Sequence, residues 1–318
     1  MKEAKATGSS LMAEYAAVRD GGVGLIDLSA RGRISVSGSE AVMFLNGLIT
    51  NDLKTLEEDR WMPAAFPNVQ GRLLAAVRML RRENDILLDT ETATREKVLK
   101  IIERFTLAGD FKVKDLTDES ALISVQGARA SELSYEGVTP VPATHTGETG
   151  FDIIVDNKES LWQSLVSQGA TPVSKEVEEI LRIEAGIARY GVDMDETHVV
   201  TETNLDDAIS YTKGCYLGQE IIIRIKHRGH VAKKLTGFRF ESEQSVAAGD
   251  VVKSADDKEI GRVTSATFSP KLGTTVALGY VRYEYLAPGT PVIVNGAAAT
   301  THDLPLVRGS WYKDLTDA

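Results

Sequence analysis

One eight-residue stretch, Lys-Gly-Cys-Tyr-Leu-Gly-Gln-Glu at positions 213–220, carries the clearest chemical signal in the sequence. It holds Cys215, the only cysteine among the 318 residues. Glycines at 214 and 218 flank this cysteine, so the backbone can turn tightly there and approach a ligand closely. A thiol presented on such a turn can act as a nucleophile or as a metal ligand once it is deprotonated.

The residues that follow, 220–228, are expected to form a short helix. Ile221, Ile222 and Ile225 share one helical face, although a run of β-branched residues also suits a strand. A helix would place Cys215 just before its N-terminus, where free amide donors and the helix dipole favour the thiolate. Lys213 adds a positive charge two residues away. Cys215 is therefore a candidate reactive thiol; the alternative is a small buried hydrophobic side chain.

A carboxylate on the apolar face of a predicted helix is the second candidate. Ser174 can cap a helix that ends near Gly186, and its apolar stripe is Val177, Ile180 and Leu181. At about 100° per residue, Glu184 falls inside this stripe and Arg182 points roughly the opposite way. A buried carboxylate is costly without partners. Glu184 therefore leans out to solvent, pairs with a nearby arginine, or accepts two N–H bonds from a ligand such as a pterin amidine.

These stretches resemble a known family. Residues 213–220 are similar to the signature of the YgfZ-type folate-binding proteins, which are relatives of the glycine-cleavage T-protein (aminomethyltransferase). Leu-Arg-Ile-Glu-Ala-Gly at 181–186 and Tyr-Gly-Val-Asp-Met-Asp-Glu at 190–196 resemble T-protein motifs, as do the blocks at 26–29, 36–38, 44–52 and 146–152. In that family the glutamate of the first motif holds the pterin ring of tetrahydrofolate, so the resemblance assigns this role to Glu184.

The sequence departs from the T-protein at one place that matters for chemistry. After its Asn-rich turn the T-protein has two glycines followed by paired aspartates, the first of which serves the aminomethyl transfer. Here the corresponding residues, 68–76, read Asn-Val-Gln-Gly-Arg-Leu-Leu-Ala-Ala, without a carboxylate. The T-protein also lacks the cysteine-containing stretch. The resemblance therefore implies a retained folate pocket, lost aminomethyltransferase chemistry and an added thiol.

The resemblance also implies a set of site residues around a folate in the central hole of a three-lobed arrangement. Lys213 is expected to meet the glutamate tail or the para-aminobenzoate side of the folate. Cys215 is expected to take up a one-carbon unit or to contact a cluster. Gln219 and Arg228 are expected to support the loop, and Asn68 and Tyr190 are further pocket candidates. No metal site is expected.

Three functions remain in view. The first is a tetrahydrofolate-binding accessory factor for the maturation or repair of iron–sulfur enzymes, including tRNA-modifying ones, with these client enzymes as partners. The alternative is a folate-dependent one-carbon transferase or demethylase of the same superfamily, against which the missing aspartates speak. The third is a structural or RNA-interaction protein using the basic segment 224–234. Whether the protein turns over a substrate stays open, but it is not expected to be a true aminomethyltransferase.

Composition narrows these alternatives. The chain has 36 basic and 46 acidic residues, a net charge of −10, which argues against direct nucleic-acid binding over a broad surface. Hydrophobic content of 42% and charged content of 26% are ordinary for a soluble globular protein. One cysteine excludes internal disulfides and a self-contained iron–sulfur ligand set. The polar first ten residues are not a signal peptide, and no apolar run is long enough for a membrane span, so a cytoplasmic protein is expected.

The order of predicted elements indicates an α+β fold. Strands at 24–29 and 33–36 are expected to pair, and so are strands at 62–66 and 73–80; a helix from about Thr92 carries Phe105 on its apolar face. Beyond Leu235, short strand-like runs alternate with Gly, Pro, Asp and Ser and no helical period appears. The predicted organisation is a flexible tail (1–10), a T-protein-like folate-binding region of two intertwined α/β lobes (11–232), and a C-terminal all-β barrel (233–318).

Overall fold

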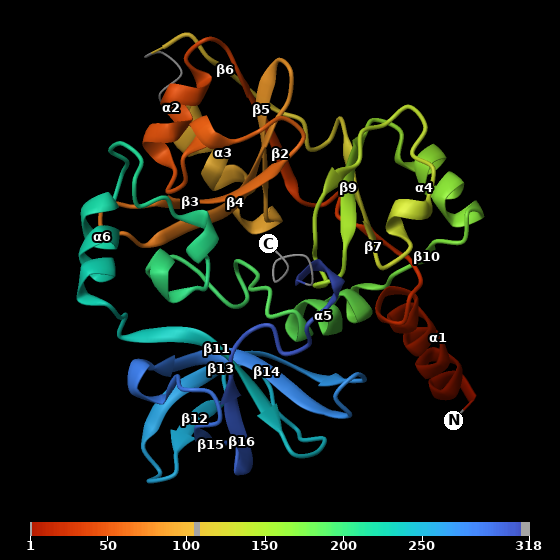
Figure 1. Cartoon of the computed structure of the whole chain (residues 1–318), viewed down its shortest axis with the longest axis vertical. Helices are drawn as coiled ribbons and strands as arrows, with labels where there is room; N and C mark the ends of the chain where they lie inside the picture. The colour runs from red at the N-terminus through yellow and green to blue at the C-terminus, as the bar shows by residue number, and fades with distance from the viewer. Residues whose placement is uncertain (1, 105–108, 313–318) are drawn as a thin grey trace.

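The computed structural model describes residues 2–104 and 109–312, and Figure 1 shows three parts. Two five-stranded sheets form two lobes, and a closed six-stranded antiparallel barrel forms the third part. The barrel lies below both lobes in this view, and α5 (Lys175–Glu184) lies between the barrel and the lobes. The predicted mixed fold with a small C-terminal barrel is confirmed.

Lobe 1 is the sheet β3-β4-β5-β2-β6 with the helices α2 and α3. Along β4, Ala75, Val77 and Met79 are buried in the core of lobe 1, so Ala76 and Arg78 lie on the opposite face. The predicted pairing of strands 62–66 and 73–80 is confirmed. Phe105 lies outside the described residues. The elements of this lobe are β2 (Gly32–Ser37), α2 (Ala41–Leu48), β3 (Trp61–Pro67), β4 (Leu73–Arg81), β5 (Asp85–Thr90), α3 (Arg95–Glu103) and β6 (Lys112–Asp115).

Lobe 2 is the sheet β10-β1-β7-β9-β8, and it corrects one strand prediction. Residues 24–29 and 33–36 do not pair: β1 joins β7 and β10, whereas β2 joins β5 and β6 in lobe 1. The short link between β1 and β2 therefore crosses between lobes instead of closing a hairpin, and this interlaces the two lobes. The elements are β1 (Gly24–Asp27), β7 (Ala121–Gln126), β8 (Val141–Pro142), β9 (Gly150–Val155), α4 (Lys158–Ser167) and β10 (Thr171–Pro172).

Two helices frame the junction with the barrel. Helix α1 (Lys2–Arg19) begins before the predicted cap at Ser9 or Ser10 and packs on α5 through Tyr15 and Val18. The predicted cap of α5 is present, since the Ser174 hydroxyl accepts from the Val177 amide. Arg182, on the side of α5 opposite the apolar stripe, is also removed from solvent. It is buried because α5 is covered on one side by α1 and on another by the barrel.

The barrel follows a helix that begins beside lobe 1. Helix α6 (Gln219–Arg228) confirms the helical alternative for this segment, with Ile222 fully buried. The barrel strands follow in the order β11-β14-β13-β12-β15-β16. Their bounds are β11 (Lys233–Phe240), β12 (Val251–Ser254), β13 (Glu259–Ser269), β14 (Thr274–Arg282), β15 (Pro291–Val294) and β16 (Ala297–His302). A return segment, 303–312, then runs back from the barrel to lobe 2, where Ser310 binds Glu148.

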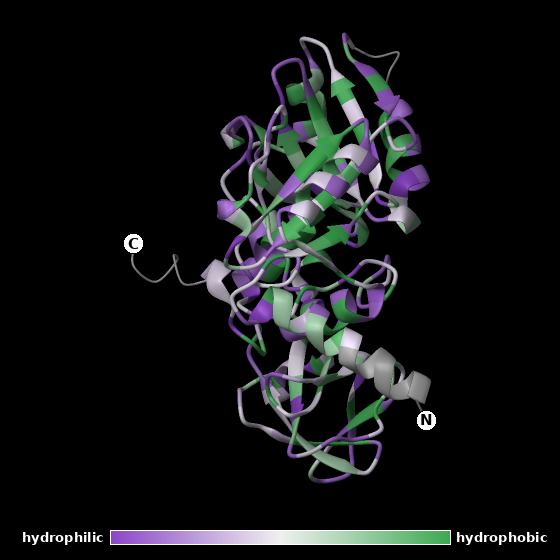
Figure 2. Cartoon of the chain, turned by 90° about the vertical axis from the view of Figure 1, so that its right-hand side faces the viewer, coloured by the Kyte–Doolittle hydropathy of each residue, from purple (hydrophilic) through white to green (hydrophobic). Residues whose placement is uncertain are grey.

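Apolar residues concentrate along the strands of the lobes, as the green ribbon in Figure 2 shows. Each lobe and the barrel has its own buried cluster. Among the helices within residues 2–104 and 109–312, none combines the length and the apolar character that a membrane span requires.

Asp193 joins α5 to the barrel. Its carboxylate is 1% exposed and accepts from the Arg182 guanidinium at 2.7 Å, from the Thr264 and Ser265 hydroxyls at 2.6 Å each, and from the Arg189 amide at 3.0 Å. Asp193→Asn should lower the free energy of unfolding by roughly 3–5 kcal/mol, because it leaves a buried arginine short of its partner and turns an N–H group toward other donors. Urea unfolding measures this loss.

The exposed barrel residue Asp256 provides the matched control. Asp256→Asn removes the same charge from a surface position and should change stability by no more than about 0.5 kcal/mol. Equal effects of the two substitutions would show that Asp193 does not hold the barrel in place.

Candidate functional site

The loop that carries Cys215 is fixed to lobe 1 while the cysteine itself is exposed. The Leu217 amide donates to the Gly47 carbonyl at 3.3 Å. Gly218 caps α6 with a φ of +78°, and a Cβ there would lie 2.3 Å from the Asn68 carbonyl oxygen. The cysteine therefore precedes α6 as predicted, on a turn whose path is set by backbone contacts with lobe 1.

Lys213 is directed into lobe 1. Its ammonium is within hydrogen-bond distance of the main-chain oxygens of Asn46 (2.7 Å), Ile49 (3.0 Å) and Asn51 (2.5 Å), around the C-terminal end of α2. Burial lowers the pKa of the Lys213 ammonium to about 8, although the negative charge of Asp52 acts to raise that pKa. In this conformation the amine joins the cysteine loop to lobe 1, and its contact with a folate tail stays a prediction.

The other residues proposed for this loop take separate positions. The Gln219 amide donates to the main-chain oxygens of Gly214 (3.3 Å) and Lys213 (3.5 Å), which is the supporting role expected of it. Arg228 is exposed in the last turn of α6, a full helix away from the cysteine loop. Cations in a last helical turn are favoured by the helix dipole, so the basic end of α6 also has a local explanation.

Asn68 and Tyr190 lie on the same side of lobe 1 as the cysteine loop. The Asn68 side chain closes the β3–β4 turn by accepting from the amides of Gln70 (2.9 Å) and Arg72 (3.0 Å). Tyr190 is 7% exposed and belongs to one apolar cluster with Leu73, Tyr216 and Ile222, among others. Of the predicted site residues, the structure thus brings together Asn68, Tyr190, Lys213, Cys215 and Gln219.

Glu184 belongs to a different part of the molecule. It is fully buried and pairs with Arg19, which is one of the three outcomes that the sequence left open, and both of its oxygens already accept hydrogen bonds. The Tyr15 hydroxyl donates to both at 2.8 and 2.9 Å, Arg19 Nε donates to Oε2 at 3.1 Å, and the Ser269 hydroxyl donates to Oε1. Burial and the adjacent carboxylate of Glu184 raise the pKa of Tyr15. A pterin could reach Glu184 only by displacing one of these donors.

A second buried carboxylate extends this network to lobe 2. Arg19 also binds Glu148 at 2.8 Å, and Glu148 accepts from the Ser310 amide at 2.8 Å. Burial acts to raise the pKa of Glu148, but the hydrogen bonds from Ser310 and Arg19 outweigh it and hold that pKa below its usual range. Helix α1, lobe 2, α5 and the return segment 303–312 are thereby joined through two carboxylates.

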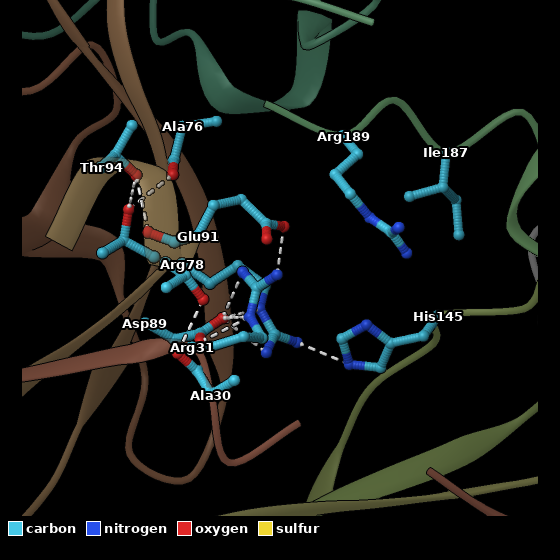
Figure 3. Close-up of polar contacts among 12 residues, drawn as sticks. Ala30, Arg31, Ala76, Arg78, Asp89, Glu91, Thr94, His145, Ile187 and Arg189 are labelled. Carbon is cyan, nitrogen blue, oxygen red and sulfur yellow. Dashed lines mark hydrogen bonds and ion pairs between the residues drawn. The ribbon is translucent and has the colours of Figure 1, made fainter. Parts of the chain in front are cut away.

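Sequence reasoning missed a cluster of charged side chains between the two lobes, part of which (Arg31, Arg78, Asp89 and His145) is labelled in Figure 3. We call Arg31, Arg78, Asp89, His145 and Asp152 the inter-lobe ion network. Arg31 binds Asp89 at 2.8 Å, Arg78 binds Asp89 and Asp152 at 2.7 Å each, and the His145 ring lies 3.1 Å from Asp152. Both aspartates are fully buried, while the side chains of the other three are 15–19% exposed.

Electrostatics favour the charged form of both aspartates in this network. Burial acts to raise the pKa of Asp152, but His145 and Arg78 outweigh it and hold that pKa well below the usual range. Burial likewise opposes ionisation of Asp89, and Arg31 and Arg78 together lower its pKa. Figure 3 draws Arg189 apart from the network; its guanidinium pairs with Glu178 at 3.0 Å and Glu179 at 2.8 Å. The clue in the sequence was an arginine at 78, in a strand whose other residues from 73 to 80 are apolar.

The inter-lobe network lies next to the place where the sequence departs from the T-protein pattern. Ala75 is fully buried in the core of lobe 1, and Ala76, drawn in Figure 3, lies on the same face of β4 as Arg78. No carboxylate is available on β4 between 73 and 81, and Asp89, Glu91 and Asp152 around it are held by arginines. Within the described ranges, no group of three or more His, Cys, Asp or Glu side chains is arranged to hold a metal ion.

Comparisons with known proteins were made along the whole chain. The model of the GCVT N-terminal domain matches residues 3–142, and that of the glycine cleavage T-protein C-terminal barrel domain matches residues 233–313. The aminomethyltransferase of Rubrobacter xylanophilus is 32% identical, over 94% of this chain and 86% of the relative. That of Thermoanaerobacter pseudethanolicus is 27% identical, over 89% and 84%.

One solved structure agrees with the fold. The glycine cleavage system aminomethyltransferase T from Bartonella henselae superposes with a TM-score of 0.86, covering 95% of this chain and 91% of that chain at 22% sequence identity. This likeness extends over both lobes and the barrel, and at this identity it speaks for the fold alone.

The cysteine loop offers a test of its rigidity with two glycines. Gly218→Ala should destabilise the protein by at least about 2 kcal/mol, because the left-handed backbone alone costs about 1–3 kcal/mol and the added Cβ would meet the Asn68 carbonyl oxygen 2.3 Å away. Gly214→Ala is the matched control, since no atom lies within 4 Å of its added Cβ. Thermal unfolding of both variants measures the difference, and equal midpoints would contradict this account of the loop.

Proposed function

The chain belongs to the glycine cleavage T-protein (aminomethyltransferase) family, and on that premise we propose that it binds a reduced folate and takes part in folate-dependent one-carbon transfer. The observation that carries the proposal is the similarity to aminomethyltransferases along 94% of the chain, through both lobes and the barrel. Tetrahydrofolate is the proposed cofactor. Cysteine chemistry is not needed for this part of the proposal.

The chemistry is proposed to differ from glycine cleavage. Transfer of an aminomethyl group develops positive charge on the reacting amine, and a nearby carboxylate stabilises that charge or moves the proton. Ala75 and Ala76 offer neither, and the carboxylates around β4 are held by Arg31 and Arg78. We therefore propose that the protein binds folate and handles a one-carbon unit without catalysing the aminomethyl transfer of the glycine cleavage reaction.

Two sets of carboxylates compete as the acceptor for the pterin amidine. Glu184 is the proposal from the sequence, and it requires that the ligand replace the Tyr15 or Ser269 hydroxyl. Asp89 and Asp152 are the structural alternative, because they lie beside partly exposed side chains at the space between the lobes. Asn68, Tyr190, Lys213, Gln219 and Arg228 stay proposed folate contacts, at positions separate from Glu184.

Titration with tetrahydrofolate tests the main proposal. We expect saturable binding of one reduced folate by calorimetry, and no aminomethyl transfer when the same preparation is added to a glycine cleavage assay with lipoylated carrier protein. Absence of binding would refute the folate proposal. Turnover at ordinary enzyme rates would refute the part that rests on Ala75 and Ala76.

A substitution on α5 identifies the pterin acceptor. Glu184→Gln should weaken folate binding by about 1.5–3 kcal/mol, the range for a hydrogen bond to a charged group. Glu176→Gln is the control, because Glu176 is exposed on the first turn of the same helix. Unchanged folate affinity together with a lower unfolding temperature would remove Glu184 from the site and leave it a purely structural group.

A second candidate function is that of an accessory factor for iron–sulfur enzymes. The observation that favours it is Cys215, an exposed thiol on a turn that Gly218 and the α2 end hold in a fixed position. One thiolate cannot hold a cluster by itself, so a client protein would have to supply the remaining ligands. Under this proposal the protein presents the thiol to clients such as tRNA-modifying enzymes and uses reduced folate as cofactor.

Cys215→Ala tests the second candidate. Because the side chain is exposed, the substitution should leave the unfolding temperature and the folate affinity nearly unchanged. It should abolish the support of iron–sulfur enzyme activity in cells that lack the native protein. Full complementation by the variant would exclude a reactive role for the thiol, whereas a large loss of thermal stability would point to packing.

A further inference from the structure

A cavity of about 620 Å³ lies at the seam between the barrel and the segment 191–198, and neither proposed function uses it. Its walls come from β13, the end of β14 and the start of β11. A smaller hollow of about 460 Å³ adjoins it, because Lys233 and Arg282 border both. We call the two together the seam cavity.

Two like charges face each other in its wall. Lys233 and Arg282 are directly opposite in the antiparallel pair of β11 and β14, so their side chains emerge on the same face of the sheet. Neither forms an ion pair within the described part of the chain; the Lys233 ammonium lies 5.2 Å from the centre of the Tyr280 ring. Like charges directly opposite across two strands are destabilising. An anion between them would remove that repulsion.

The chain does not supply this anion from the carboxylates nearby. Four of the five that border the seam cavity already have partners: Asp193, Asp195, Glu202 and Glu259 accept from neighbouring groups. The fifth, Glu284, borders only the smaller hollow. Lys233 and Arg282 are therefore the cations of this lining without an ion-pair partner among the described residues, since Arg262 pairs with Glu259.

Tyr280 adds an unused hydrogen-bond donor to the same wall. It is 5% exposed, and its hydroxyl is the only buried polar group of the cavity lining that lacks a partner in the described chain. The His198 ring stacks on it with centroids 4.4 Å apart, which holds the tyrosine in place. A buried hydroxyl without a partner is costly, so a ligand oxygen or a water carried with it would satisfy a group that the fold leaves unpaired.

We propose that the seam cavity binds an oxyanion group, a phosphate or a carboxylate, of a small ligand. Lys233 and Arg282 supply the charge, and Tyr280 supplies a neutral donor beside the aromatic surface that it forms with His198. The proposal stands independently of folate binding, because it rests on barrel residues and on the seam. A phosphate-containing probe and a carboxylate-containing probe, used in turn, distinguish the two kinds of oxyanion.

Inorganic pyrophosphate and tri-γ-glutamate are the two probes for calorimetry on the full-length protein. We expect at least one to bind with a dissociation constant below about 1 mM, and the tighter of the two identifies the group. The double variant Lys233→Gln/Arg282→Gln should weaken that binding at least tenfold. Lys258→Gln, an exposed barrel position outside the cavity lining, removes a similar charge and should leave binding unchanged.

Two further readouts keep the proposal open to refutation. Lys233→Gln alone should not lower the unfolding temperature of the ligand-free protein, because it removes a like-charge contact, and added probe should stabilise the wild type more than this variant. Tyr280→Phe should weaken the probe severalfold while the protein stays folded. Failure of both probes to bind, or equal losses in the double variant and in Lys258→Gln, would overturn the proposal.

Discussion

The arrangement of this protein depends on two carboxylates buried at the junction of its parts. Glu184 and Asp193 lie at and just beyond the end of α5, and each is almost fully removed from water. A buried charge is tolerated only when donors surround it. Here α1 and the barrel supply those donors together. The two carboxylates therefore have their full set of hydrogen bonds only when the barrel is in its observed place. These polar contacts set the orientation of the barrel together with the apolar cluster in which Ile183 packs on Leu235 and Leu278.

A similar constraint joins the two lobes to each other. Asp89 belongs to lobe 1 and Asp152 to lobe 2, and Arg78 bridges them at 2.7 Å on either side. The bridge occupies the face of β4 on which Ala76 lies. Where relatives are expected to present a carboxylate for proton movement, this protein presents compensated ion pairs. Such pairs can orient a bound ligand, but they hold their protons and charges fixed over the ordinary pH range.

The cysteine loop combines a fixed backbone with an exposed side chain. Lys213 anchors one side beneath α2, and Gly218 closes the other against the β3–β4 turn. Cys215 lies between them and forms none of these anchoring contacts within the described residues. The sequence suggested Lys213 as a positive neighbour for the thiol. In the structure its ammonium donates to main-chain oxygens of lobe 1 and so holds the loop in place.

The sequence by itself determined the local and patterned features. The alternation in residues 73–80, the cap at Ser174 and the turn residues after 235 indicated the strands, helix α5 and the barrel, because each of these depends on neighbours along the chain. It also placed Glu184 in an apolar stripe, and its motifs indicated the family. It could not give the pairing of residues 24–29, which join a sheet formed by strands a hundred residues later.

Only the tertiary structure decided which charges meet. The helix pattern placed Arg182 opposite the apolar stripe of α5, but it could not show that α5 is covered on two sides and that Arg182 is buried as well. The residues of the inter-lobe network come from positions 31 to 152. Those of the seam cavity include Lys233, Tyr280 and Arg282. Neither site could therefore be predicted from residue spacing along the chain. The physical reason is common to both: an ion pair or a cavity depends on distances in space between distant segments, whereas sequence patterns report only which face of its own element a residue occupies.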